Sequence, residues 1–239
     1  MIKFFRKIRQ HLLSKNKLGK YFFYAIGEIV LVMIGILLAL YVNNWNIEKE
    51  RNKQQIAVLK QLHKDFQLSL NDLKENYNTH DRGITSAQII LNALETNQSY
   101  TDSLAKHFGE LGMTRFISTT GAFESLKSIG FDLIKNDELR NKIIRMHDEY
   151  YESVYTFDSG MFLRHTYIRE AFVKYYDQVT WRARPLDYES LKTSEEYKTI
   201  LRTHIYQLEI LQNRLYEQVI QEILNIQDEI LEEINRLQL

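Results

Sequence analysis

Apolar residues fill one stretch near the N-terminus and recur at helical spacing through most of the remaining chain. Residues 21–42 are apolar apart from Glu28. At a rise of 1.5 Å per residue this stretch makes about 33 Å of helix, enough to cross a hydrocarbon core of about 30 Å. The pattern therefore predicts a transmembrane helix over 21–42.

Aromatic side chains flank the predicted span. Tyr21 and Tyr24 lie at its N-terminal end, and Tyr41 and Trp45 lie at its C-terminal end. Amphipathic rings at both ends are typical of membrane–water interfaces. The alternative is a cleaved signal peptide, but the apolar core of such a peptide has about 7–15 residues and small residues precede its cleavage site. The longer apolar run, with leucines at the cleavage spacing before Tyr41, favours an uncleaved anchor.

Beyond the span, apolar residues continue in steps of three and four. This spacing predicts an amphipathic helix over 45–80, continuous with the span, and a further helix over about 85–96 that ends at residues 97–99. Each helix buries one apolar face, so these segments predict a helical bundle rather than isolated helices.

Capping residues divide the middle of the chain. Thr120 is suited to begin a short helix that ends near Gly130, and Asn136 is suited to begin a helix that runs to about Tyr176. Pro185 marks a loop. The sequence thus predicts an all-α fold, in which one transmembrane helix continues into an elongated extracytoplasmic helical bundle.

The C-terminal segment, about 194–239, shows the most regular pattern. Its apolar residues recur at a mean spacing of about 3.6, which predicts a straight amphipathic helix. The stripe consists of Leu208, Leu211, Leu215, Val219, Ile223, Ile226, Ile230, Ile234 and Leu237. The charged back of the same helix is assigned to Glu217, Glu222, Glu229 and Glu233.

Charge orients the predicted span. The chain has 31 basic and 31 acidic residues; seven bases and no acid lie in 1–20, and Glu28 is the one acid of 21–42, which leaves 24 bases and 30 acids in 43–239. Positive flanks stay in the cytoplasm. We therefore expect a single-pass protein of the inner membrane with cytoplasmic residues 1–20, a span at 21–42 and a periplasmic helical domain at 43–239. The zero net charge disfavours a nucleic-acid partner.

The basic segment has a helical pattern of its own. Phe5, Ile8 and Leu12 recur at helical spacing. A basic amphipathic helix binds the anionic lipids of the inner leaflet, whereas the alternative is that the bases only orient the anchor. The residues assigned to the lipid surface are Lys3, Arg6, Lys7 and Arg9.

Two groups of segments form a distinctive pattern. The first is 4–9 (FFRKIR), 20–21 (KY), 25–29 (AIGEI), 34–40 (IGILLAL) and 43–46 (NNWN), and the second is 120–127 (TGAFESLK) and 133–140 (LIKNDELR). These segments resemble an uncharacterised family of Bacteroidota membrane proteins that is defined as a domain of unknown function. The resemblance implies a cell-envelope protein of the Gram-negative type and brings no catalytic residues.

Sequence motifs for chemistry are sparse. The chain has no Cys, no His-Glu-x-x-His zinc motif and no Gly-rich phosphate loop after a strand, so we expect no catalysis, metal or cofactor. Many aromatic residues lie between Tyr150 and Tyr176. His165 lies within this aromatic cluster, and His147 lies just before it. A pocket for a glycan or a peptide is one interpretation of this cluster, and burial in the core is the favoured one.

Glu28 interrupts the predicted span, where a carboxylate is costly. Glu28, Val32, Gly35 and Ala39 share a helix face, and Gly35 and Ala39 form a small-xxx-small pair that lets helices approach closely. We assign these four residues to a helix–helix interface in the membrane. Glu28 would be protonated in a homo-oligomer, or paired with a cation of a different membrane protein, or a solitary neutral acid.

Three functional hypotheses follow. The first is a membrane-anchored periplasmic scaffold or interaction protein of the cell envelope that self-associates or joins another membrane protein through its span. The alternative is an accessory or stator-like subunit of an ion-coupled membrane complex that uses Glu28, by fold-level analogy. A weaker hypothesis, an extracytoplasmic sensor, needs a partner that carries the signal.

Overall fold

The computed structural model describes residues 18–178 and 183–238, with side chains throughout these ranges except at 18–21, 24, 161–169 and 171. Within these ranges the chain is helical and contains no strand; a single bridge joins Tyr176 to Pro185. The all-α prediction is therefore confirmed. The chain divides into two units, and the boundary lies between Gln54 and Gln55.

The first helix, α2 (Leu18–Glu95), is 78 residues long. Its apolar stretch in the first unit is long and apolar enough to cross a membrane, and none of it is buried by the described residues. The predicted continuity between the apolar stretch and the helix that follows is confirmed. Asn97, with φ of 54°, lies just beyond the end of α2, as the predicted break at 97–99 requires.

The predicted interruption between residues 80 and 85 is wrong, because α2 continues through Gly83. A Cβ on Gly83 would lie 3.4 Å from both Glu110 O and Leu208 Cδ1. These are ordinary van der Waals distances, so a backbone segment and another helix pack against α2 at this residue. Tertiary packing thus holds the helix at a residue of poor helix propensity.

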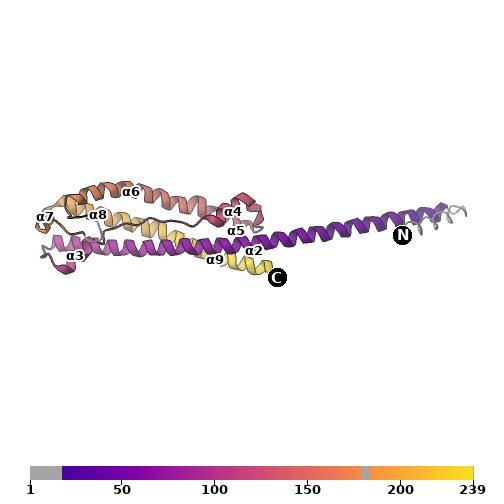
Figure 1. The fold of residues 1–239 in the computed structure, drawn as a ribbon, viewed down its shortest axis with the longest axis horizontal. Helices are drawn as coiled ribbons and strands as arrows, with labels where there is room; N and C mark the ends of the chain where they lie inside the picture. Colours follow the sequence, from indigo (N-terminus) through magenta and orange to yellow (C-terminus); the bar gives the residue numbers. More distant parts are fainter. Residues whose placement is uncertain (1–17, 179–182, 239) are drawn as a thin grey trace. The chain divides into compact units, whose positions relative to one another are not determined.

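The second unit contains two long helical runs beside the 55–95 part of α2 (Figure 1). One run consists of α5 (Asp137–Arg145), a π-helical segment η2 (Met146–Tyr151) and α6 (Glu152–Val173). The other consists of α8 (Glu195–Ile210), a π-helical segment η3 (Leu211–Tyr216) and α9 (Glu217–Gln238). The shorter helices are α3 (Asp102–Phe108), α4 (Gly121–Ile129), the 3-10 turn η1 (Phe131–Leu133) and α7 (Tyr188–Thr193).

The predicted helix ends are confirmed, with one difference in mechanism. Asn136 caps α5 by accepting a hydrogen bond from Leu139 N at 3.2 Å, and Gly130 ends α4 with φ of 117°. Thr120 occupies the N-cap position of α4, but its side chain makes no capping bond. Asp65 of α2 takes over that role, since its Oδ2 accepts from Ala122 N at 2.7 Å.

The C-terminal apolar stripe forms much of the core. Seven of its nine residues are buried, and Leu215 and Leu237 are half-buried. The assignment of Glu233 to the charged back is wrong, because this residue is only 3% exposed. Its carboxylate accepts from Gln55 Nε2 at 3.2 Å and from Arg236 at 2.7 Å, so hydrogen bonds compensate for burying the charge.

One extended segment was not predicted. Residues 111–120, which we call the strap, join the end of α3 to α4 without helical or strand structure. The strap lies along the helices of the second unit, and its backbone groups therefore need hydrogen-bond partners from side chains (Figure 1).

Candidate functional site

The open face of α2 carries the residues predicted as a helix–helix interface. Glu28, Val32, Gly35 and Ala39 are separated by four, three and four residues, so in α2 they share one face. Val32 is 56% exposed, and a Cβ built on Gly35 would meet no atom within 4 Å. On this face Val32, Gly35 and Ala39 are exposed and Glu28 is half-buried, and the partner of the face remains a prediction.

The predicted interfacial aromatics are only partly described. Tyr41 and Trp45 are 70% and 58% exposed, and Lys49 Nζ lies 5.3 Å from the ring centroid of Trp45, within cation–π range. Tyr21 and Tyr24 belong to α2, and their side chains lie outside the described ones. The predicted lipid-surface residues also lie outside the described residues: Lys3, Arg6, Lys7 and Arg9.

Side chains of α2 and α6 hold the strap in place. Because the strap has no strand beside it, its N–H groups donate to side-chain acceptors, which satisfies a backbone that would otherwise be left without partners. The donor and acceptor pairs are Thr114 with His80 (3.2 Å), Phe116 with Asp158 (3.0 Å), Ile117 with Asp72 (2.9 Å), Ser118 with Tyr155 (3.2 Å) and Thr119 with Ser69 (2.9 Å).

Asp158 is the most perturbed acid among these acceptors. Its side chain is 1% exposed, and burial raises its pKa to about 6, with a smaller contribution from the charge of Asp72. The hydrogen bond from Phe116 N and the charge of Arg115 act in the opposite direction. Asp158 Oδ1 and the Tyr216 hydroxyl are both buried without a hydrogen-bond partner among the described residues.

His147 lies in an aromatic box. Its ring stacks on Phe123 at 3.8 Å between centroids, with Tyr151 edge-on at 5.0 Å and Phe66 at 5.7 Å. Burial lowers the pKa of His147 to about 4, so the ring is neutral at pH 7. Among the described residues, no group of three or more His, Asp or Glu could hold a metal ion.

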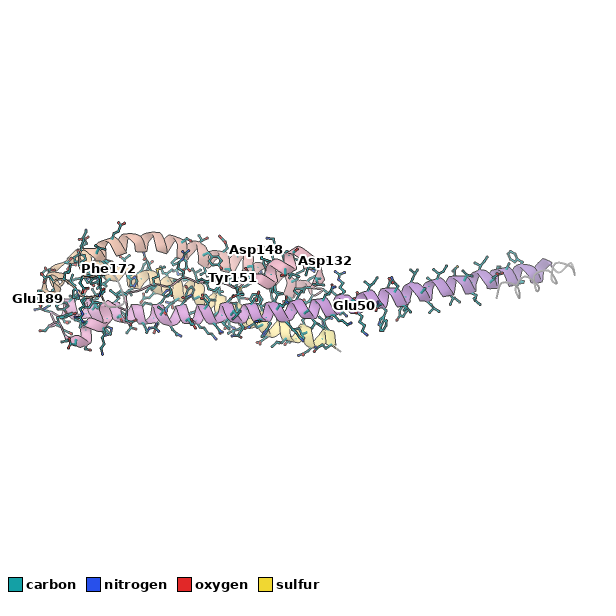
Figure 2. All side chains as sticks on the ribbon, viewed as in Figure 1. Glu50, Asp132, Asp148, Tyr151, Phe172 and Glu189 are labelled. Atoms are coloured by element: carbon teal, nitrogen blue, oxygen red, sulfur yellow. The ribbon has the colours of Figure 1, made fainter. Side chains whose placement is uncertain are left out.

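The predicted burial of the aromatic cluster is confirmed for Tyr151, Phe172 and Tyr176, which are 1%, 3% and 5% exposed. Figure 2 labels Tyr151 and Phe172 among the helices of the second unit. The other members with described side chains are half-buried: Tyr150, Tyr155, Phe157 and Tyr175. The hydroxyl groups of Tyr176 and Tyr197 form a hydrogen bond with each other inside this core. Phe162 and His165 belong to the part of α6 whose side chains lie outside the described ones.

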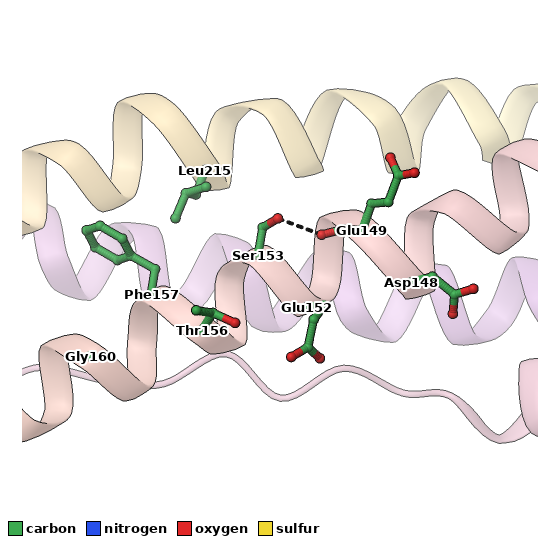
Figure 3. A pocket seen from close by; sticks show the side chains of 8 residues that line it. All are labelled: Asp148, Glu149, Glu152, Ser153, Thr156, Phe157, Gly160 and Leu215. Carbon is green, nitrogen blue, oxygen red and sulfur yellow. Dashed lines mark hydrogen bonds between the residues drawn. The ribbon is translucent and has the colours of Figure 1, made fainter.

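A groove of about 600 Å³ opens on the surface of α6 (Figure 3). The carboxylates of Asp148, Glu149 and Glu152 lie toward one end, and Phe157 and Leu215 face each other toward the other end. Both π-helical segments contribute to it, since η2 supplies two of the acids and η3 supplies Leu215. Such segments occur frequently at functional sites. The other lining residues are Ser153, Thr156 and Gly160.

Comparison with known proteins identifies the family. A sequence profile described as a family of unknown function, DUF6090, matches residues 28–180. The chain belongs to DUF6090. The range that matches DUF6090 begins at Glu28 and contains all four residues of the Glu28 face, the strap and the α6 side of the groove, whereas Leu215 lies beyond it.

No curated protein sequence matches this DUF6090 member, and no solved structure matches it.

Sequence reasoning missed the strap acceptors and the groove. His80, Asp72 and Asp158 lie 34, 45 and 42 residues from the amides that they bind, and no local pattern predicts such pairs. One signal was present for the groove: Asp148, Glu149 and Glu152 lie within five residues on a helix that otherwise buries aromatic rings.

Proposed function

We propose that this protein is a membrane-anchored scaffold of the cell envelope, whose span joins a membrane complex while residues 43–239 present a helical bundle in the periplasm. The observation that carries the proposal is the contrast within α2. Its 55–95 part is packed into a core, whereas the apolar stretch before it has no cover from the described residues. An uncovered apolar helix of that length requires lipid or another protein.

The test of the anchor and its partner uses single cysteines, because the chain has none of its own. We would introduce Gly35→Cys, Ala39→Cys and, on the opposite face, Leu37→Cys, and then oxidise native membranes. Homodimer crosslinks at Ala39 but not at Leu37 are expected for self-association. A heavier product without homodimer indicates a different membrane partner. Recovery of the protein in the soluble fraction would refute the anchor.

Orientation is tested by a cysteine in the second unit. Ser128 is exposed, so Ser128→Cys leaves the core unchanged. Labelling of this residue by an impermeant maleimide from the periplasmic side supports the proposal, and labelling only after the inner membrane is opened contradicts it.

The second candidate function is an accessory subunit of an ion-coupled membrane complex. Glu28 favours it, because an acid lies within the uncovered apolar stretch of α2. Glu28→Gln separates the two functions. A scaffold tolerates the neutral isostere, whereas a proton-coupled subunit loses activity while its membrane complex still assembles.

A further inference from the structure

The groove on α6 has charge at one end and apolar side chains at the other. Asp148, Glu149 and Glu152 are exposed, and none of them forms an ion pair with any residue that the structure describes. Three unneutralised carboxylates on adjacent turns create a local negative potential that attracts a cation. The charge of the groove therefore selects a basic ligand.

The other end of the groove favours an apolar side chain. Phe157 and Leu215 are half-buried and face each other across the gap between α6 and η3 (Figure 3). Burying further apolar surface there is favourable because it removes that surface from water. A purely polar cation would leave the apolar end of the groove exposed to water. The groove as a whole therefore fits an amphipathic ligand.

The dimensions fit a helix. The lining residues on the α6 side run from Asp148 to Gly160, a rise of about 18 Å, which equals the length of a helix of about 12 residues. Ser153 and Gly160 are small, and a Cβ built on Gly160 would meet no atom within 4 Å. Small residues along a groove let a second helix approach closely.

We infer that this groove binds an amphipathic helix of a partner protein, with basic residues at one end and an apolar anchor about two turns away. The acids of the groove pair with Lys or Arg of that helix, and its apolar residue packs between Phe157 and Leu215. Helix-in-groove recognition uses anchors at i and i+7 in this way. The inference rests on the proposed scaffold function and names the chemistry of the partner.

The test measures binding of a defined probe to the full chain in nanodiscs of zwitterionic lipid. The probe is a fluorescent 16-residue helical peptide with leucine at one position and lysines about two turns further along. Fluorescence anisotropy should show saturable binding that weakens as salt rises, since exposed charge pairs are screened. Empty nanodiscs measure binding to lipid.

Two sets of variants locate the site. The combined Asp148→Asn, Glu149→Gln and Glu152→Gln variant should weaken binding by at least about tenfold. A matched control that neutralises exposed acids elsewhere, Glu124→Gln, Asp228→Asn and Glu232→Gln, should leave the affinity unchanged. Gly160→Leu fills the apolar end and should also weaken binding, with thermal unfolding confirming that each variant is folded.

Other outcomes overturn the inference. Equal loss in both acid variants means that the peptide responds only to overall charge. Competition by spermidine at the affinity of the peptide, with no effect of Gly160→Leu, indicates a site for small cations instead. Absence of peptide binding to the folded protein refutes the site. None of these outcomes changes the crosslinks expected for the span, so the crosslinking experiment tests the scaffold proposal independently of the groove.

Discussion

At the scale of single residues, Asp158 makes stability depend on pH. Its pKa is about 6 in the folded protein and 3.8 as an ordinary aspartate, so the folded state binds the proton more tightly. Its contribution to stability is complete below about pH 4 and is lost as pH rises through 6. Between pH 7 and 4.5 the wild-type protein should gain about 2 kcal/mol relative to Asp158→Asn.

The measurement is the free energy of unfolding of both proteins in detergent, by urea titration at the two pH values. If the difference in unfolding free energy between wild type and variant stays constant with pH, then burial does not raise the pKa of Asp158.

Two histidines with lowered pKa values, His80 and His147, provide a second prediction with a built-in control. Burial lowers the pKa of both His80 and His147 from 6.5 to about 4, so both contribute to stability above about pH 6.5 and lose that contribution as pH falls from 6.5 through 4. His147 Nε2 has no hydrogen-bond partner among the described residues, whereas His80 Nε2 accepts from Thr114 N. His147→Phe should therefore stabilise the protein, by about 1 kcal/mol at pH 5.

His80→Phe should destabilise it instead, by about 1–3 kcal/mol at pH 7, because the Thr114 amide loses its acceptor. Melting temperatures of the two variants at pH 7 and 5 decide the matter. If both variants melt alike, the hydrogen bond to the strap contributes nothing measurable.

At the scale of elements, the stability that each side-chain acceptor gives the strap depends on whether water can reach the amide that it binds. Ser69 is fully buried and accepts from Thr119 N, whereas Asp72 accepts from Ile117 N, on a residue whose exposed fraction is 71%. Ser69→Ala should destabilise by about 1–3 kcal/mol. Asp72→Ala should cost less, because water replaces the carboxylate at Ile117.

Hydrogen exchange across residues 111–120 measures this prediction. Faster exchange throughout the strap is expected in Ser69→Ala, and a more local change is expected in Asp72→Ala. The reverse order would mean that the two acceptors do not hold the strap as the distances suggest.

The helices were predictable from sequence because their information is local. The spacing of Leu208 to Ile234 and the caps at Asn136 and Gly130 lie within a few residues of the elements that they define. The strap was not predictable, since its acceptors come from other helices. Glu233 was misassigned for a related reason: on the helix it lies beside the charged back, but Gln55, 178 residues away, meets it in the core.

The candidate sites divide in the same way. The Glu28 face follows from helical spacing alone, so its residues could be named in advance. The groove needs Leu215 opposite α6, and neither π-helical segment leaves a recognisable pattern in the sequence.

At the scale of the whole molecule, the two units should behave as separable parts. The buried residues of both hydrophobic clusters lie between Val58 and Ile234, and the half-buried residues packed against them lie between Ile56 and Leu237. A chain of residues 46–239 should therefore remain helical, unfold cooperatively and stay soluble, whereas the full chain remains with the membrane fraction.

Circular dichroism, thermal unfolding and ultracentrifugation of both chains measure this prediction. An aggregated or unfolded 46–239 chain would show that the bundle requires the first unit, or a second copy, to close.

The hydrogen bond between Gln55 and Glu233 also constrains how the protein is made. A ribosome adds about 5–20 residues per second, so Glu233 follows Gln55 by roughly 10–40 s. Throughout that interval the apolar face of α2, with Leu59, Leu62 and Phe66, has been synthesised without the last helix that covers it. The nascent chain therefore exposes an aggregation-prone surface until synthesis ends. We expect its folding to require a chaperone that binds the apolar face of α2 during synthesis.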